Sequence, residues 1–151
     1  SLDDFAPLAD IPGITFYSLQ KGQASEEVFN PPNSMRIINL EKELNDFSDT
    51  AAVINNMDLI ISTDTAVVHL AGAIGKPIWT LLHTSSDWRW FLNRDNSPWY
   101  PEMRLYRQSK FNDWKGLFKQ VKEALLQKIN GSGMRTTEHN EYALQYSSNQ
   151  S

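Results

Sequence analysis

The chain has 151 residues, no cysteine, and a formal net charge of -4 from 14 basic and 18 acidic side chains. Its length suits one domain with its own hydrophobic core, and the lack of cysteine excludes a disulfide framework and any thiolate metal site. No basic run indicates a nucleic acid partner, no apolar run is long enough to span a membrane, and three scattered histidines show no metal-ligand spacing, so we expect a metal-free cytoplasmic protein.

The first part of the chain alternates helical and strand patterns. Apolar residues recur at a helical spacing before Pro12 and Gly13, and two later runs are rich in β-branched side chains. In chain order we predict a helix at residues 2–8, strands at 14–19 and 35–40, and a helix capped within 46–49 that runs over 50–57.

The segment MDLIISTDTAVVHLAGAIGKP at residues 57–77 joins a strand, a polar turn and a helix of small residues. Residues 58–62 form a continuous apolar run, which is typical of a parallel strand covered on both faces. Residues 63–65 can cap a helix over 66–74. Open α/β sheets bind ligands at the carboxyl ends of their strands, and a helix N-terminus favours phosphate there. We therefore predict an anion site at Asp64 and Thr65, with His69 on the same helix face.

The remaining chain predicts two more strands and a closing helix. We expect strands at residues 78–82 and 103–108, an aromatic loop at 83–102, a helix from Asp113 to Gly131, and a polar tail. Strands that alternate with helices indicate an α/β fold with a parallel sheet. We assign residues 1–131 to one domain and expect residues 132–151, which are polar and unpatterned, to be disordered or only locally ordered.

Four stretches of the sequence resemble one enzyme family. They are SLQKG at residues 18–22, DFSDTAAVI at 46–54, MDLIISTDTAVVHLAGAIGKPIWTLL at 57–82, and DWRWFLNRDNSPWYPEMRLYRQ at 87–108. Together they resemble the C-terminal half of bacterial glycosyltransferase family 9 proteins, the heptosyltransferase relatives, and especially the branch often fused to tetratricopeptide repeats. The resemblance implies a Rossmann-like parallel sheet flanked by helices, as the C-terminal domain of a GT-B glycosyltransferase.

The resemblance also implies a function and a set of site residues. The domain would bind a nucleoside diphosphate sugar as donor, without a metal or other cofactor. A separate N-terminal domain would hold the catalytic base and the acceptor, which is a glycan, a lipid-linked glycan or a protein. By position, Asp64, Thr65 and Ala66 resemble the turn that contacts the diphosphate and sugar. The other implied contacts are His69 and Lys21 at the leaving diphosphate, Gln20 beside them, and Asp46 and Phe47 in the loop that reads the base.

The same resemblance implies that a central strand is missing. In relatives, a strand and a glycine-containing loop precede the segment that corresponds to Ser1. Without that strand we expect a gap, a rearranged sheet or a strand supplied by another chain. We therefore expect this chain by itself to be inactive.

Each candidate residue also has a purely structural interpretation. Asp64 and Thr65 are common helix-capping residues, a single histidine on an apolar helix is often structural, and Lys21 can be a solvated turn residue. Two functional alternatives also stay open. One is a degenerate transferase domain that serves assembly or regulation, and the other is a nucleotide-sugar epimerase of the same architecture.

Overall fold

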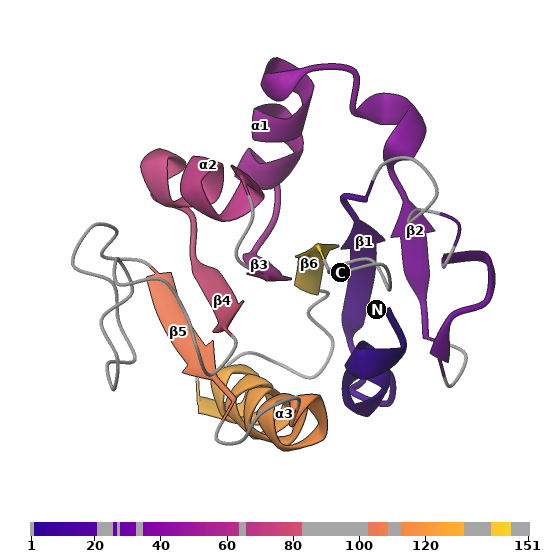
Figure 1. Cartoon of the computed structure of the whole chain (residues 1–151), viewed down its shortest axis with the longest axis vertical. Helices are drawn as coiled ribbons and strands as arrows, with labels where there is room; N and C mark the ends of the chain where they lie inside the picture. The colour runs from indigo at the N-terminus through magenta and orange to yellow at the C-terminus, as the bar shows by residue number, and fades with distance from the viewer. Residues whose placement is uncertain are drawn as a thin grey trace.

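The computed structural model describes residues 2–20, 26, 28–32, 35–63, 66–82, 103–108, 113–131 and 140–145. Within them, six parallel strands form one sheet in the order β2-β1-β6-β3-β4-β5 (Figure 1). The strands are β1 (Ile14–Ser18), β2 (Ile37–Asn39), β3 (Leu59–Thr63), β4 (Ile78–Leu82), β5 (Met103–Arg107) and β6 (Asn140–Gln145). The helices are the 3₁₀ helices η1 (Leu2–Leu8) and η4 (Glu41–Glu43) and the α-helices α1 (Phe47–Asn55), α2 (Ala66–Ile74) and α3 (Trp114–Gly131).

Helices cover both faces of the sheet, which gives the domain three layers. α1 and α2 lie on one face, and η1 and α3 lie on the other (Figure 1). Crossovers that move toward β5 pass through α1 and α2, whereas the return from β5 to β6 passes through α3 on the opposite face. These helical crossovers therefore share one hand, as parallel strands require. The predicted α/β fold, a Rossmann-like parallel sheet flanked by helices, is confirmed.

Each face of the sheet has its own apolar core. Under η1 and α3 the core combines aliphatic and aromatic side chains, with 4.5 Å between the ring centroids of Phe5 and Phe118 and 6.3 Å between those of Phe16 and Tyr142. Under α1 and α2 the core is mainly aliphatic. Because both faces are covered, all five residues of β3 and all five of β4 are buried. Their continuous apolar pattern is thus explained.

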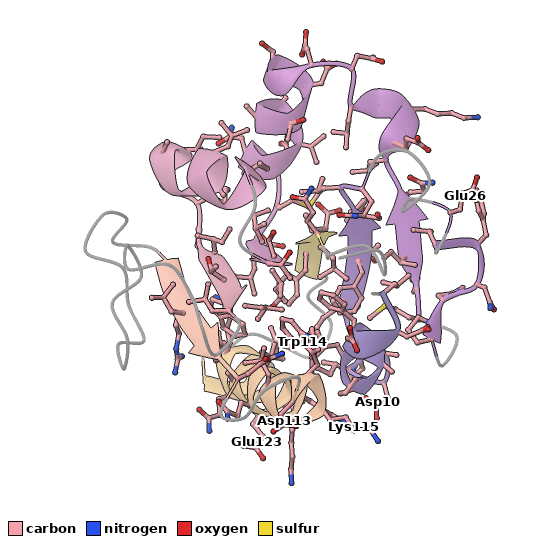
Figure 2. The ribbon with its side chains drawn as sticks, viewed as in Figure 1. Asp10, Glu26, Asp113, Trp114, Lys115 and Glu123 are labelled. Atoms are coloured by element: carbon pink, nitrogen blue, oxygen red, sulfur yellow. The ribbon has the colours of Figure 1, made fainter. Side chains whose placement is uncertain are left out.

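α3 is amphipathic and closes one core, as predicted. Leu117, Val121 and Leu125 are at most 1% exposed. Figure 2 shows Trp114 on the sheet side of the helix and Glu123 on its outer side. Among the described residues, α3 and the shorter helices all lack the length and apolar character needed to cross a membrane.

Local signals set the ends of α1 and α2. The Asp46 side chain accepts a hydrogen bond from the Asp49 N–H at 2.9 Å and so caps α1. Gly75 follows the last turn of α2 with a φ of 83°, a conformation that glycine adopts at little cost. The helices predicted at residues 50–57 and 66–74 are therefore confirmed in type and in approximate bounds.

The expectation of a disordered C-terminal tail is wrong for residues 140–145. These residues form β6, which lies between β1 and β3 and pairs with both. Tyr142, Ala143 and Leu144 are completely buried, with 0% exposure each. The physical cause of the error is that polar residues flank these three, so the segment lacks the long apolar run of a typical central strand. Residues 132–139 and 146–151 lie outside the described part of the chain.

β6 occupies the place of the strand that the family resemblance implied was missing. In the Rossmann order the first strand lies between the second and the fourth. β6 takes the equivalent position, because β1 and β2 lie on one side of it and β3, β4 and β5 lie on the other. The sheet is therefore rearranged, and the central position holds a strand from later in the same chain.

Two tyrosines next to this central position have altered acidity. Burial, together with the nearby charge of Asp58, raises the pKa of Tyr142 to about 12. The Tyr142 hydroxyl is buried and has no hydrogen-bond partner in the part of the chain that the structure describes. Burial and a hydrogen bond to Glu141 raise the pKa of Tyr17 above its usual value. The shift of Tyr142 reflects its complete burial in β6.

Candidate functional site

The carboxyl ends of β1, β6 and β3 lie side by side at one edge of the sheet. Ser18 of β1 is in register with Leu144 of β6, and Gln145 of β6 is in register with Ser62 of β3. β2, which follows β1 in the chain, lies on one side of this position, and β4, which follows β3, lies on the other side. Such a switch in direction is where open α/β sheets bind ligands. The candidate site is therefore this edge around β6.

Gln20 lies at this edge, one residue beyond the end of the β1 hydrogen-bonding pattern. It is 6% exposed, and its N–H donates to Ser18 Oγ at 3.2 Å. This turn fixes the direction in which the chain leaves β1. Lys21 follows immediately but lies outside the described residues, so its phosphate contact stays a prediction.

β3 leads into α2 at the same edge. β3 ends at Thr63 and α2 begins at Ala66, so only two residues separate the buried strand from the helix. The free N–H groups of the first turn of α2 consequently lie at the carboxyl edge of the sheet. Asp64 and Thr65, the two connecting residues, lie outside the described part. His69 is one turn into α2, and its side chain is not among those described.

A second helix begins at this edge, because α1 follows the end of β2 through η4. Asp46 caps α1 there: Asp46 Oδ1 accepts the Asp49 N–H at 2.9 Å, and Asp49 Oδ2 accepts the N–H of Asn45, the residue before the cap, at 3.0 Å. Phe47 is the first residue of α1, and its side chain lies outside the description. The structure gives Asp46 a capping role, and the contact of Asp46 and Phe47 with the base stays a prediction.

Gln108 is a polar residue of this edge that the sequence analysis did not select. It follows β5, is 4% exposed, and donates its N–H to the Leu82 carbonyl at 3.1 Å. Within the described part of the chain, neither atom of its side-chain amide has a hydrogen-bond partner. Leaving such a group unpaired costs about 1–3 kcal/mol. No local signal marked it, because the strand that precedes Gln108, MRLYR, contains two arginines and is not an apolar run.

The chemistry of the edge suits an anionic ligand. The N-terminus of α2 presents backbone N–H groups there and carries a partial positive charge, whereas the N-terminus of α1 is already capped by the Asp46 carboxylate. In the described residues, no three His, Cys, Asp or Glu side chains are grouped so that they could hold a metal ion.

Comparisons with known proteins agree with this arrangement. The profile of glycosyltransferase family 9 (heptosyltransferase) matches residues 19–115, which run from the residue after β1 through the β3–α2 unit to the start of α3. Protein FlbA from Caulobacter vibrioides is 32% identical over 126 residues, which are 79% of this chain and 20% of FlbA. The chain therefore spans about one fifth of the length of that relative. No solved structure matches the chain. The match to the family profile covers more than half of the sequence, and the chain belongs to glycosyltransferase family 9.

Proposed function

We propose that this chain is the donor-binding part of a GT-B glycosyltransferase. The observation that supports it most is the β3–α2 unit, in which a fully buried strand leads within two residues to a helix N-terminus at the switch point of the sheet. Such a helix end favours phosphate, because its free N–H groups and its dipole attract negative charge. In a member of this family, the phosphate ligand is a nucleoside diphosphate sugar.

In this proposal the chain stabilises the leaving diphosphate without a metal. Negative charge develops on the diphosphate as its bond to the sugar breaks, and donors placed at that charge lower the barrier. The first-turn N–H groups of α2, together with Lys21, Thr65 and His69, supply these donors. Gln20 contacts the phosphates from the β1 side. The acceptor is activated by a base elsewhere.

The proposal concerns one part of a larger enzyme. A further N-terminal domain holds the acceptor, which is a glycan, a lipid-linked glycan or a protein, and supplies the base. The intact protein belongs to the branch of the family that is fused to tetratricopeptide repeats. Hexosyl or heptosyl transfer is the reaction class.

Titration calorimetry tests donor binding directly. ADP, GDP, UDP and CDP and one sugar conjugate of each are titrated into the chain. Thr65→Ala should weaken the tightest of these at least tenfold, because it removes a hydroxyl that can donate to the phosphates, and a hydrogen bond to a charged group is worth about 1.5–3 kcal/mol. Asp64→Ala should weaken only the sugar conjugates, whose hydroxyls can donate to its carboxylate.

Asp10→Ala serves as the matched control. Asp10 pairs with Lys122 at 3.1 Å on the η1 and α3 side of the molecule, and its side chain is 73% exposed (Figure 2). Its removal should leave nucleotide affinity unchanged. Failure of all eight ligands to bind a folded sample would contradict the proposed function.

A further inference from the structure

The two halves of the candidate site lie on strands that do not touch each other. One half, residues 18–20, follows β1, and the other half, residues 62–63, ends β3. Among the described strands, β1 pairs with β2 and β6, and β3 pairs with β4 and β6. β6 is therefore the link between the β2-β1 pair and the β3-β4-β5 group. Two strand spacings of about 4.8 Å each set the halves roughly 10 Å apart.

β6 is fastened to its neighbours at both of its ends. At the amino end, the Glu141 N–H donates to Asp58 Oδ2 at 2.7 Å, and the Asp58 N–H donates to the Glu141 carbonyl at 2.8 Å. The Tyr17 hydroxyl donates to Glu141 Oε1 at 3.1 Å. At the carboxyl end, the Leu19 N–H donates to the Leu144 carbonyl at 2.9 Å. Contacts from both β1 and the start of β3 thus hold the strand.

The composition of β6 makes these contacts important. Its completely buried residues number three, Tyr142, Ala143 and Leu144, whereas all five residues of β3 and of β4 are buried. The hydroxyl of Tyr142 has no hydrogen-bond partner among the described residues, which weakens the gain from burying it. β6 thus buries three apolar residues, the same number as β3, and one of the three carries the hydroxyl without a described partner. Its docking depends on the fastening by β1 and Asp58.

We infer that β6 is a positioning strand, which sets the separation of the two half-sites and whose docking is therefore coupled to donor binding. The coupling follows because a ligand that contacts both halves binds only the arrangement in which β6 is in place. By reciprocity, a bound ligand strengthens the docking of β6. The ligand-binding part of this inference rests on the proposed function, and the positioning part does not.

A reversible covalent lock tests both parts. Asp58 and Glu141 lie opposite each other, one register step before the Leu59 and Tyr142 pair. Opposed residues of neighbouring strands lie about 4.8 Å apart, within the Cα separation that a disulfide spans. The chain has no cysteine, so the variant Asp58→Cys/Glu141→Cys has one possible disulfide. Its oxidised form holds β6 in place, and its reduced form lacks both carboxylates of the fastening.

Hydrogen exchange gives the readout that needs no ligand. The Leu19 amide is protected by its bond to Leu144 at the opposite end of β6 from the lock. It should exchange at least about fivefold faster in the reduced than in the oxidised form, the low end of the range for coupled sites. Equal exchange in the two forms would overturn the positioning role. Formation of disulfides only between chains would overturn the placement of β6.

Nucleotide affinity gives the second readout, with ADP, GDP, UDP and CDP as the probes. Affinity should be at least about fivefold weaker in the reduced form and return to the wild-type value on oxidation. Asp58 lies five residues before Thr63, or about 16 Å along β3, so a direct effect on the ligand is excluded. Wild-type binding combined with equal affinity of the two forms would overturn the coupling. If no nucleotide binds the wild type, the proposed function and the coupling are both wrong. The hydrogen-exchange measurement still tests the positioning role, because it needs no ligand.

A milder pair of variants covers the case in which the double cysteine variant does not fold. Asp58→Ala removes the carboxylate that accepts the Glu141 N–H, whereas Asp58→Asn retains an acceptor oxygen of the same shape. Faster Leu19 exchange in Asp58→Ala but not in Asp58→Asn supports the inference. Unchanged exchange in both variants overturns it.

Discussion

β4 and β6 are both buried strands of one parallel sheet, yet only β4 is recognisable in the sequence. β4 is buried at all five positions, and its apolar run follows directly from the short α2 crossover. β6 buries three residues between polar ones, and its neighbours β1 and β3 come from distant parts of the chain. The contrast shows that two neighbouring strands with free edges can bury a segment between them, even when the composition of that segment does not indicate burial.

The sharpest test of this contrast is a matched pair of leucines. Leu81 of β4 is 1% exposed and Leu144 of β6 is 0% exposed, and both belong to the same apolar core. Each change to alanine should lower the free energy of unfolding by about 2–5 kcal/mol, since each leaves a cavity of similar size. Urea unfolding followed by circular dichroism measures both. A full cost for Leu81→Ala with none for Leu144→Ala would break the comparison and return residues 140–145 to a solvated tail.

The Asp46 cap tests α1, an element whose start is set by nearby residues in the sequence and not, as for β6, by distant strands. Asp46→Ala removes the bond to the Asp49 N–H and should cost about 1 kcal/mol, whereas Asp46→Asn should cost little because asparagine also caps. Thermal unfolding measures the difference. If Asp46→Asn is as stable as the wild type but binds nucleoside diphosphate more weakly, the residue has the predicted ligand role in addition to the cap. An equal loss of stability in both variants would contradict the capping role.

The hydroxyl of Tyr142 tests how fully β6 is desolvated. Tyr142→Phe removes a buried group without a described partner, so stability at pH 7 should stay the same or rise by up to about 1 kcal/mol. Because the folded-state pKa of Tyr142 is raised from 10.0 to about 12, the unfolded chain ionises first as the pH rises above 10, and the stability of the tyrosine form falls progressively toward pH 12. The phenylalanine variant lacks that loss. Urea unfolding from pH 8 to 11.5 should show its advantage growing with pH, and a constant difference would indicate that Tyr142 is solvated.

The smallest expected effect is at the start of α3. There the gain in helix propensity from replacing Gly116 opposes the loss of the Asp113 cap. A side chain at Gly116 would collide with Asp113 Oδ2, while Asp113 Oδ1 accepts the Gly116 N–H at 3.1 Å. Gly116→Ala should therefore change stability by less than about 0.5 kcal/mol, since a helix gain of about 1 kcal/mol is offset by loss of the cap. In an Asp113→Ala background the same change should stabilise by about 1 kcal/mol. Equal effects in the two backgrounds, by thermal unfolding, would show that no such opposition exists.

Much of the fold was predictable because it depends on neighbours in sequence. The apolar runs of β3 and β4, the cap at Asp46 and the stop at Gly75 each act within a few residues. The edge that carries the candidate site was predictable for the same reason, since the β3–α2 turn marks it. Gln108 was missed because its burial depends on the sheet edge around Leu82, which no window of the sequence contains.

The sequence by itself determined the α/β class, the strand–turn–helix unit at residues 59–74 and the likeness to glycosyltransferase family 9. Only the tertiary structure decided what fills the centre of the sheet. β1 and β3 are separated by about forty residues, and each has a row of backbone groups that must be hydrogen-bonded when buried. β6 satisfies both rows, and Asp58 and Leu19 fasten it there. The need for these hydrogen bonds arises from the spatial arrangement of β1 and β3. The polar sequence of β6 does not reveal it.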